Sequence, residues 1–222
     1  MPRIARVVAV GYPHHVTQRG NNREWVFLDD EDRSFYLTTL SRYSKKFHLS
    51  IWAYCLMNNH VHLLAVPRQS DSLAKSIGTT NLVYSQYFNR KNNRSGRIWQ
   101  NRFFSCVVDR ESYLWAVARY VERNPVRAGI VDQPLNYRWS SASGNGGGAE
   151  DFLLGSDEWL TTGERESYSN FLHQRDDEAE TIRKATSTGR PLGEDRFTLR
   201  IETLTGKQLR TGKPGRPGKT QH

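Results

Sequence analysis

The chain has 222 residues, a formal net charge of +9 and 11% aromatic residues, enough for one substantial core with room for an appendage. The positive charge calls for an acidic partner, of which nucleic acid is the usual one. No apolar run approaches the roughly 20 residues that span a bilayer, and no secretory segment follows Met1. We therefore expect a cytoplasmic, nucleoid-associated protein without a membrane partner, and we expect the isolated Cys55 and Cys106 to be reduced core residues.

The first half of the chain alternates between strand-like and helical segments. Residues 7–19 and 25–28 predict two strands around the turn at Gly20-Asn21-Asn22. Apolar spacing predicts a helix over about 31–47. The chain then continues with predicted strands at 49–56 and 60–66, joined by a turn at Asn58-Asn59, and a second helix from Asp71 or Ser72 to about Phe88.

The following segments complete the predicted fold. Residues 98–108 are strand-like, and Asp109 is placed to cap a third helix over about 111–124, with Pro125 just beyond its end. This order, with its short hairpin links, predicts an α+β fold. We expect a ferredoxin-like antiparallel sheet with helices on one face, followed by a helical and basic C-terminal extension.

Composition predicts four parts along the chain. We expect a first domain over 1–142, which the motifs described below make the catalytic domain, then a flexible Gly-rich linker over 143–150, a helical extension over 151–182 and a basic, partly disordered DNA-binding tail over 183–222. In the tail, Arg216 lies between Gly215 and Pro217, as in a short minor-groove hook. A tail that adds only non-specific affinity is an equal alternative.

A pair of histidines occupies the second hairpin. Since side chains alternate along a strand, His60 and His62 fall on one face, while Val61 and Leu63 point to the other. Two imidazoles held side by side form half of a metal site. Taken alone, His-x-His is more often a pair of ordinary histidines.

The third predicted helix carries two further candidates. Tyr120 and Asn124 are four residues apart, so they are neighbours on one stripe of that helix. A buried amide without a partner costs about 1–3 kcal/mol, and either a metal ion or the helix end before Pro125 would satisfy Asn124. Tyr120 is either a nucleophile or a core tyrosine, and Tyr113 is its competitor for the first role.

Together these residues suit metal-assisted attack of a tyrosine on a phosphodiester. The metal would be held by His60, His62 and Asn124, and Tyr120 would form a covalent intermediate. No general base for the phenol is evident, and no phosphate-binding loop of the G-x-x-x-x-G-K-[ST] type is present.

Two segments are candidates for contacting DNA. Cations alternate with aromatic residues in the loop from Asn89 to Arg102, a pattern typical of single-stranded or hairpin DNA binding; a solvated basic loop is the alternative. Its candidate residues are Arg90, Lys91, Arg94, Arg97, Trp99 and Arg102. On the first hairpin the candidates are Arg19, Asn21, Asn22 and Arg23.

Long motifs in this sequence resemble those of the HUH single-tyrosine transposases, and most closely the IS200-like REP-associated tyrosine transposases of bacteria. The motifs are YCLMNNHVHLL at 54–64, YVERNPVRAGIV at 120–131, HVTQRGNNR at 15–23 and YRWSS at 137–141. The resemblance makes His60, His62 and Asn124 the metal ligands, Tyr120 the nucleophile and Arg19, Asn21, Asn22 and Arg23 base-reading residues.

The resemblance also implies an activity. It implies a Mg²⁺- or Mn²⁺-dependent enzyme that cuts and rejoins single-stranded DNA next to REP-type hairpins through a 5′-phosphotyrosine, acting as a monomer. Two alternatives use the same residues differently: a domesticated hairpin-binding protein that does not cleave, and a metal phosphoesterase that uses water.

Overall fold

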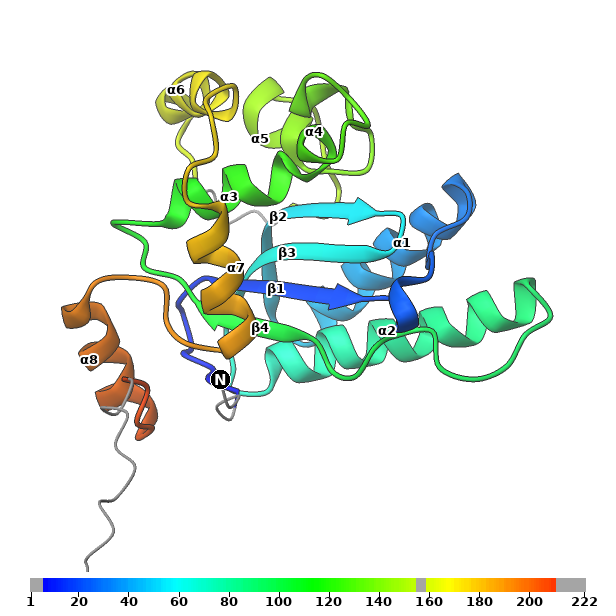
Figure 1. The fold of residues 1–222 in the computed structure, drawn as a ribbon, viewed down its shortest axis with the longest axis horizontal. Coiled ribbons are helices and arrows are strands. Elements are labelled where there is room, and N and C mark those ends of the chain that lie inside the picture. The colour runs from blue at the N-terminus through cyan, green and yellow to red at the C-terminus, as the bar shows by residue number, and fades with distance from the viewer. Residues whose placement is uncertain (1–5, 155–158, 211–222) are drawn as a thin grey trace, which may run out of the picture.

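The computed structural model describes residues 6–154 and 159–210. Its centre is a four-stranded antiparallel sheet in the order β2-β3-β1-β4 (Figure 1). The strands are β1 (His14–Arg19), β2 (Leu49–Met57), β3 (His60–Pro67) and β4 (Phe104–Val107). With eight α-helices in the described ranges, this arrangement confirms the predicted α+β fold class.

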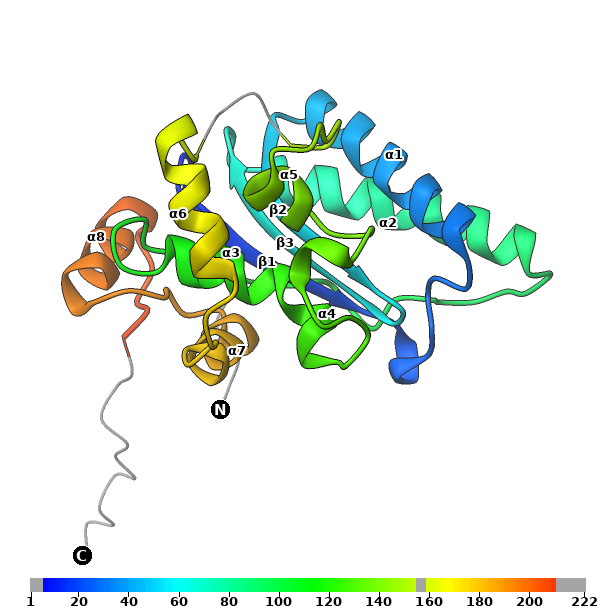
Figure 2. The same cartoon turned by 90° about the horizontal axis from the view of Figure 1, so that it is seen from above.

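Two long helices cover one face of the sheet (Figure 2). They are α1 (Asp30–Lys46) and α2 (Ser72–Lys91), close to their predicted bounds. Asp29 caps α1 by accepting a hydrogen bond from the Asp32 amide at 2.9 Å. Beneath the helices, Phe27, Tyr36 and Tyr84 form a buried aromatic cluster.

The opposite face of the sheet carries α3 (Leu114–Glu122) and α7 (Ala179–Thr188). The prediction placed the helices on one face of the sheet. This is correct for α1 and α2, but α3 and α7 lie on the other face. Nearly every residue of β2 and β3 is buried. A strand buried on both faces needs cover on both, and α3 and α7 provide the second layer.

Three segments differ from their predicted form. Residues 7–10 and 25–28 are not strands, and β4 is much shorter than the predicted segment 98–108. After β1, residues Asn21–Arg23 form the short 3-10 helix η1, which follows the extended Gly20. A Cβ on Gly20 would lie 2.3 Å from the Glu24 carbonyl oxygen, so only glycine fits there.

The helix predicted over 111–124 is interrupted. It ends at Glu122, and a separate short helix α4 (Asn124–Arg127) follows. The 3-10 helix η2 (Pro134–Asn136) then leads to α5 (Ala142–Gly147).

The Gly-rich segment 143–150 was expected to be a flexible linker, and this expectation is corrected, because most of it forms α5. The Asn145 amide is buried and donates to the Trp52 carbonyl at 2.9 Å. A Cβ on Gly146 would lie 2.8 Å from the Leu172 side chain. Composition predicted chain freedom, whereas the glycines here allow close packing between α5 and α6 (Thr162–Leu172).

The C-terminal extension joins the core. Leu153, Tyr168, Leu172 and Ile182 belong to the same buried cluster as the sheet. Farther along, α8 (Asp195–Thr205) packs its buried residues into a smaller cluster with the N-terminal segment and β4; its members are Val7, Ala9, Val107, Phe197, Ile201 and Leu209.

The expected basic tail over 183–222 thus begins inside α7 and includes α8. Arg216 lies outside the described residues, and apart from the linker the division of the chain into domains stays a prediction. Within 6–154 and 159–210, no helix combines the length and apolar character needed to cross a membrane. Cys55 and Cys106 are both free and buried, as expected.

Candidate active site

His60 and His62 lie on the same face of β3, as the alternation predicts. Their rings are 5.0 Å apart and nearly perpendicular. In the antiparallel register, His60 lies opposite Arg19 and His62 opposite Thr17 of β1. The two imidazoles therefore lie at the start of β3, an inner strand of the sheet, on the face that α3 and α7 cover.

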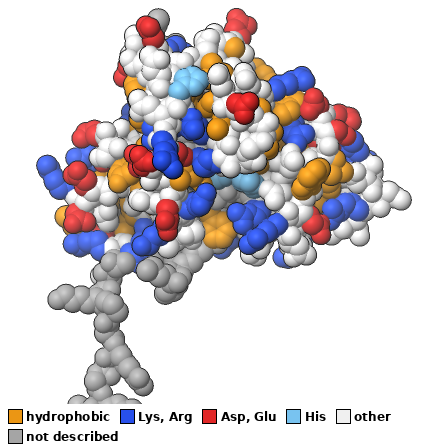
Figure 3. Space-filling model, turned by 45° about the horizontal axis from the view of Figure 1, so that its top comes forward, with side chains coloured by type: hydrophobic (Ala, Val, Ile, Leu, Met, Phe, Trp, Pro, Cys, Tyr) orange, Lys and Arg blue, Asp and Glu red, His pale blue; other side chains and the backbone are white. Residues whose placement is uncertain are grey.

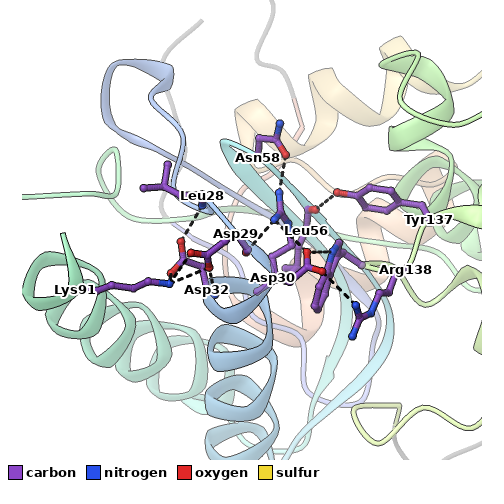
Figure 4. Close-up of polar contacts among 11 residues, drawn as sticks. Leu28, Asp29, Asp30, Asp32, Leu56, Asn58, Lys91, Tyr137 and Arg138 are labelled. Carbon is purple, nitrogen blue, oxygen red and sulfur yellow. Dashed lines mark hydrogen bonds and ion pairs between the residues drawn. The ribbon is translucent and has the colours of Figure 1, made fainter.

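The turn that leads into His60 is held rigidly from outside the hairpin. Its Asn58 carbonyl accepts hydrogen bonds from the amides of Val26 and Phe27 at 2.8 and 3.1 Å. The Asn58 side chain accepts from the Arg33 guanidinium of α1 at 2.7 Å (Figure 4). These contacts fix the start of β3 and so the position of His60.

Tyr120 is brought to the same place from α3. Its ring meets the edge of His62 at 5.6 Å and of His15 at 5.4 Å. The Arg127 guanidinium lies over the same ring, 4.1 Å from the ring centre, and donates to the Tyr120 carbonyl at 3.0 Å. A cation from α4 is thus in direct contact with the candidate nucleophile.

Asn124 fills the junction between α3 and α4. Its amide nitrogen donates to the carbonyls of Tyr120 and Val121 at 3.0 and 3.1 Å. The side chain therefore satisfies the end of α3, one of the two roles considered from the sequence. Because both hydrogen bonds use the amide nitrogen, the carboxamide oxygen is the atom that can coordinate a metal ion.

All four candidate residues line one pocket of about 950 Å³. Its walls come from β1, β3, α3, α4 and α7, and Figure 3 shows histidine side chains bordered by Lys and Arg on this side of the molecule. Its charged lining residues include Arg19, Arg127, Glu180, Arg183 and Lys184. The excess of cations suits a polyanionic strand.

The histidines of this pocket are held neutral. Burial, with Arg19 and Arg127 nearby, lowers the pKa of His60 to about 4. Burial and the neighbouring His60 and His15 place the pKa of His62 well below its usual value. A metal binds the neutral imidazole, so neither group has to lose a proton near pH 7.

The donor set fits a divalent metal ion. His60 Nδ1 is hydrogen bonded to Asn59 Oδ1 at 2.6 Å, and His62 Nδ1 to His15 Nε2 at 3.0 Å, which leaves the Nε2 atom of each ring. No cluster of three or more His, Cys, Asp or Glu side chains suited to a metal occurs in the described residues. Two imidazoles and the Asn124 oxygen would thus share the ion with substrate or water.

Sequence reasoning assigned no role in the site to His15, Arg127 or α7. His15 is fully buried beside His62 with its ring plane parallel, 5.2 Å away. It is the first residue of the HVTQRGNNR motif at 15–23, but its contact with His62 depends on the pairing of β1 with β3. Nothing local in the sequence of α7 signals its place beside the histidines.

The first-hairpin candidates for DNA contact lie around the end of β1. Arg19 is exposed and lines the pocket. Asn22 and Arg23 of η1 have φ of 51° and 62°, a left-handed conformation that projects the loop beyond the sheet. Asn21 is half-buried, while Asn22 and Arg23 are exposed.

The segment predicted as a DNA-binding loop begins in the last turn of α2, and its cations differ in how they are engaged. Arg90, Arg94, Arg97 and Arg102 are exposed, and Arg94 lies 3.8 Å from Glu24. Lys91 pairs with the carboxylates of Asp29 and Asp32 (Figure 4) and with that of Glu31, at 2.8–2.9 Å.

Trp99 does not have the exposed position that base stacking requires. It is 8% exposed, packs against the aromatic cluster and donates to the Asn81 carbonyl at 3.2 Å. The structure thus corrects the expected role of Trp99 and gives Lys91 a structural one. Both assignments rested on composition, which does not show which side chains are already engaged.

The sequence matches the family model described as "Transposase IS200 like" over residues 9–124, which is more than half of the chain. The chain belongs to the IS200-like transposase family. The matched region of this IS200-like transposase contains His60, His62, Tyr120 and Asn124, and it ends before Arg127 and the whole of α7.

Two relatives of this IS200-like transposase extend the comparison. A protein of Haemophilus influenzae assigned as a REP-associated tyrosine transposase is 27% identical over 122 residues, covering 50% of this chain and 67% of the relative. A solved structure of a REP-associated tyrosine transposase bound to a REP hairpin covers 73% of this chain and 96% of its own, with a TM-score of 0.54 and 16% identity. At that identity the structural likeness concerns the fold.

Proposed function

We propose that this transposase is a metal-dependent single-strand DNA endonuclease that cleaves and rejoins DNA next to REP-type hairpins through a 5′-phosphotyrosine. The observation that carries the proposal is the common pocket of His60, His62, Tyr120 and Asn124. These residues come from β3, α3 and α4, yet the tyrosine ring is in edge contact with His62. A tyrosine whose only role is packing in the core would not need to contact this histidine.

The reaction requires one bond to form as another breaks. The Tyr120 oxygen attacks the scissile phosphorus, the bond from phosphorus to the 3′ oxygen breaks, and the 5′ phosphate stays on Tyr120. The phenol proton passes to solvent, and the departing 3′ oxygen takes one up. A 3′-hydroxyl can reverse the attack, because the phosphotyrosine retains the energy of a phosphodiester.

The chain's own residues assist in distinct ways. Arg127, stacked on the Tyr120 ring, stabilises the phenolate as the proton departs. Arg19, Arg183 and Lys184 line the pocket where they would hold strand phosphates. A Mg²⁺ or Mn²⁺ ion held by His60, His62 and Asn124 would polarise the scissile phosphate.

The hairpin partner is proposed from the relatives, since the solved structure of similar fold holds a REP hairpin. The exposed arginines of the loop after α2 and the projecting η1 loop supply cations for it. Because one chain supplies Tyr120, His60 and His62 to the same pocket, we propose that the enzyme acts as a monomer. Its place of action would be the nucleoid.

One assay tests the proposal. The protein is incubated with Mn²⁺ and labelled single-stranded DNA that carries a REP-type hairpin, and the products are separated on a denaturing gel. We expect a covalent protein–DNA adduct that Tyr120→Phe abolishes. Tyr113→Phe is the matched control, because Tyr113 is half-buried at the start of the same helix, and it should keep the adduct.

Two other outcomes would replace the proposal. Free cleaved product that is undiminished in Tyr120→Phe would identify a water-using phosphoesterase. Hairpin binding without cleavage in either metal would identify a non-cleaving binding protein.

A further inference from the structure

A chain of buried hydrogen bonds runs from α7 to His62. The Thr186 hydroxyl donates to the Ile182 carbonyl at 2.8 Å, one turn earlier in the helix. Thr186 Oγ1 lies 2.7 Å from His15 Nδ1, and His15 Nε2 lies 3.0 Å from His62 Nδ1. All three side chains are at most 6% exposed, so water does not compete for these contacts.

The direction of each hydrogen bond follows from the one before it. The Thr186 hydroxyl has one proton, and it donates this proton to the Ile182 carbonyl. Its oxygen therefore acts as an acceptor toward His15, and also toward the Cys106 thiol at 3.3 Å. His15 Nδ1 must then carry a proton and donate it. Because a charge in this fully buried position is costly, His15 has no second proton, and its Nε2 accepts.

Because His15 Nε2 is an acceptor, it determines the tautomer of His62, the candidate metal ligand. His62 must donate from Nδ1 to reach His15, which leaves a lone pair on His62 Nε2. If Thr186 instead donated to His15, both rings would reverse, and His62 Nε2 would carry the proton and bind no metal. The hydrogen bond to Ile182 is therefore what makes His62 a ligand.

The tautomer of His60 is determined by a different contact. The Asn59 amide nitrogen donates to the Arg23 carbonyl at 3.1 Å, which turns its Oδ1 toward His60 Nδ1 at 2.6 Å. His60 thus donates from Nδ1 and also has a free Nε2 lone pair. The two rings reach the same tautomer through different partners.

We propose that Thr186 and His15 are positioning residues that hold His62 in its metal-binding tautomer. This inference rests on the proposed function, because it takes His60 and His62 as the metal ligands. It gives α7 a role in the site, although Thr186 is 171 residues from His15 along the chain and lies outside the region matched to the family. Outer-shell partners of this kind orient ligand histidines and raise their affinity for metal.

The test reads the tautomer directly. Nitrogen-15 spectra of the histidine side chains of the metal-free full-length protein should show His62 protonated at Nδ1. Thr186→Val keeps the shape of the side chain but removes the acceptor, and we expect His62 to become a mixture of tautomers. Thr186→Ser should restore the single form.

Metal affinity gives a second reading. Titration calorimetry with Mn²⁺ alone should show a loss of about 10–100-fold in Thr186→Val and wild-type affinity in Thr186→Ser. Thr188→Val is the matched control, because Thr188 makes the same kind of hydrogen bond within α7, to the Lys184 carbonyl at 2.8 Å. Thr188→Val should change neither the tautomer of His62 nor the affinity for Mn²⁺.

The outcomes separate this inference from the proposed function. Wild-type protein with His62 protonated at Nε2, or a Thr186→Val variant with an unchanged tautomer, would overturn the role of Thr186. If Thr186→Val does not fold, the wild-type tautomer and Thr186→Ser still decide the question. If no covalent adduct that depends on Tyr120 forms, the proposed function is wrong. The tautomer measurement does not depend on that result.

Discussion

The Asn124 side chain has two polar atoms, and the proposed site uses them for different purposes. The amide nitrogen closes the end of α3 with two hydrogen bonds, and the oxygen is the atom that we propose as a metal ligand in the pocket that Asn124 lines. The capping role and the ligand role considered from the sequence are therefore compatible. An aspartate could supply only the oxygen, and an alanine could supply neither atom.

Substitutions at Asn124 should separate these two roles. In Asn124→Asp, the carboxylate cannot donate to the Tyr120 and Val121 carbonyls and lies at the negative end of the α3 dipole. We expect the unfolding free energy to fall by about 1–3 kcal/mol, while Mn²⁺ affinity is kept or raised. Asn124→Ala should lose both stability and metal affinity. Urea unfolding and Mn²⁺ calorimetry measure the two effects, and an Asp variant as stable as the wild type would contradict the capping role.

The nature of the ligands also predicts which metal works better. Two imidazoles and one amide are softer than the all-oxygen set that Mg²⁺ prefers. We expect formation of the covalent adduct to be faster with Mn²⁺ than with Mg²⁺ at equal concentration. Time courses on the denaturing gel measure this, and equal rates in both metals would count against a site made of both histidines.

Among the elements, α3 is held by one buried carboxylate. Glu122 accepts hydrogen bonds from Ser141 at 2.6 Å, Asn145 at 2.7 Å and Tyr168 at 2.6 Å, and so joins α3 to α5 and α6. Complete burial outweighs these three donors and raises the pKa of Glu122 from 4.5 to about 7. The element that carries Tyr120 thus depends on a group that titrates near neutral pH.

This carboxyl group should make stability depend on pH. Folded Glu122 binds its proton up to about pH 7, whereas the unfolded chain releases it near 4.5. The unfolding free energy should therefore decrease as pH rises through this window, by on the order of 3 kcal/mol from Glu122 alone. Glu122→Gln keeps the side-chain shape and should remove this part of the slope.

Urea unfolding of both proteins at several pH values between 4.5 and 7.5 tests the pH effect. The comparison is the difference between variant and wild type, since other groups titrate equally in both. Parallel profiles would show that Glu122 has an ordinary pKa.

Two ion pairs hold the link between α6 and α7 against the nucleophile helix. Arg119 of α3 pairs with Glu178 at 2.7 Å, and Arg127 of α4 pairs with Asp176. The acidic cluster that precedes α7 therefore forms ion pairs with α3 and α4. This contact also places the start of α7 beside the pocket.

At the scale of the whole molecule, the net charge of +9 does not show which cations can contact DNA. Some cations form ion pairs with carboxylates, and others are exposed without such a partner in the described part of the chain. Arg90 and Lys91 are adjacent at the end of α2 and show the difference. Lys91 is paired with three carboxylates. The Arg90 side chain is exposed and makes no ion pair with any described residue.

These neighbours form a matched pair of tests. Arg90→Gln and Lys91→Gln each lower the net charge by one. Only Arg90→Gln should remove a phosphate contact, reducing the slope of log affinity against log salt by about 0.7–0.9. Hairpin-DNA binding measured at several salt concentrations gives the slopes. An equal reduction in both variants would mean that net charge, and not this contact, sets the salt dependence.

Much of the fold and half of the site could be predicted from local sequence patterns. Alternation along residues 49–67 gave the second hairpin and placed His60 and His62 on one face, because the period of a strand is a local property. Helical spacing gave α1 and α2, and it made Tyr120 and Asn124 neighbours. Motif resemblance then connected the histidines with the tyrosine.

Only the tertiary structure decided which side chains are already engaged. Trp99 is buried and Lys91 is neutralised by carboxylates, although both stand in a stretch that composition marks as a DNA-binding loop. The Gly-rich segment folds as α5 because packing against α6 outweighs its chain freedom. The contact of Thr186 with His15 spans 171 residues, and no local period encodes a contact of that range. The sequence by itself determined which residues are the candidate ligands and the candidate nucleophile, because these candidates depend on residue type and local spacing. The tertiary structure decided what surrounds them, because that depends on how distant segments pack.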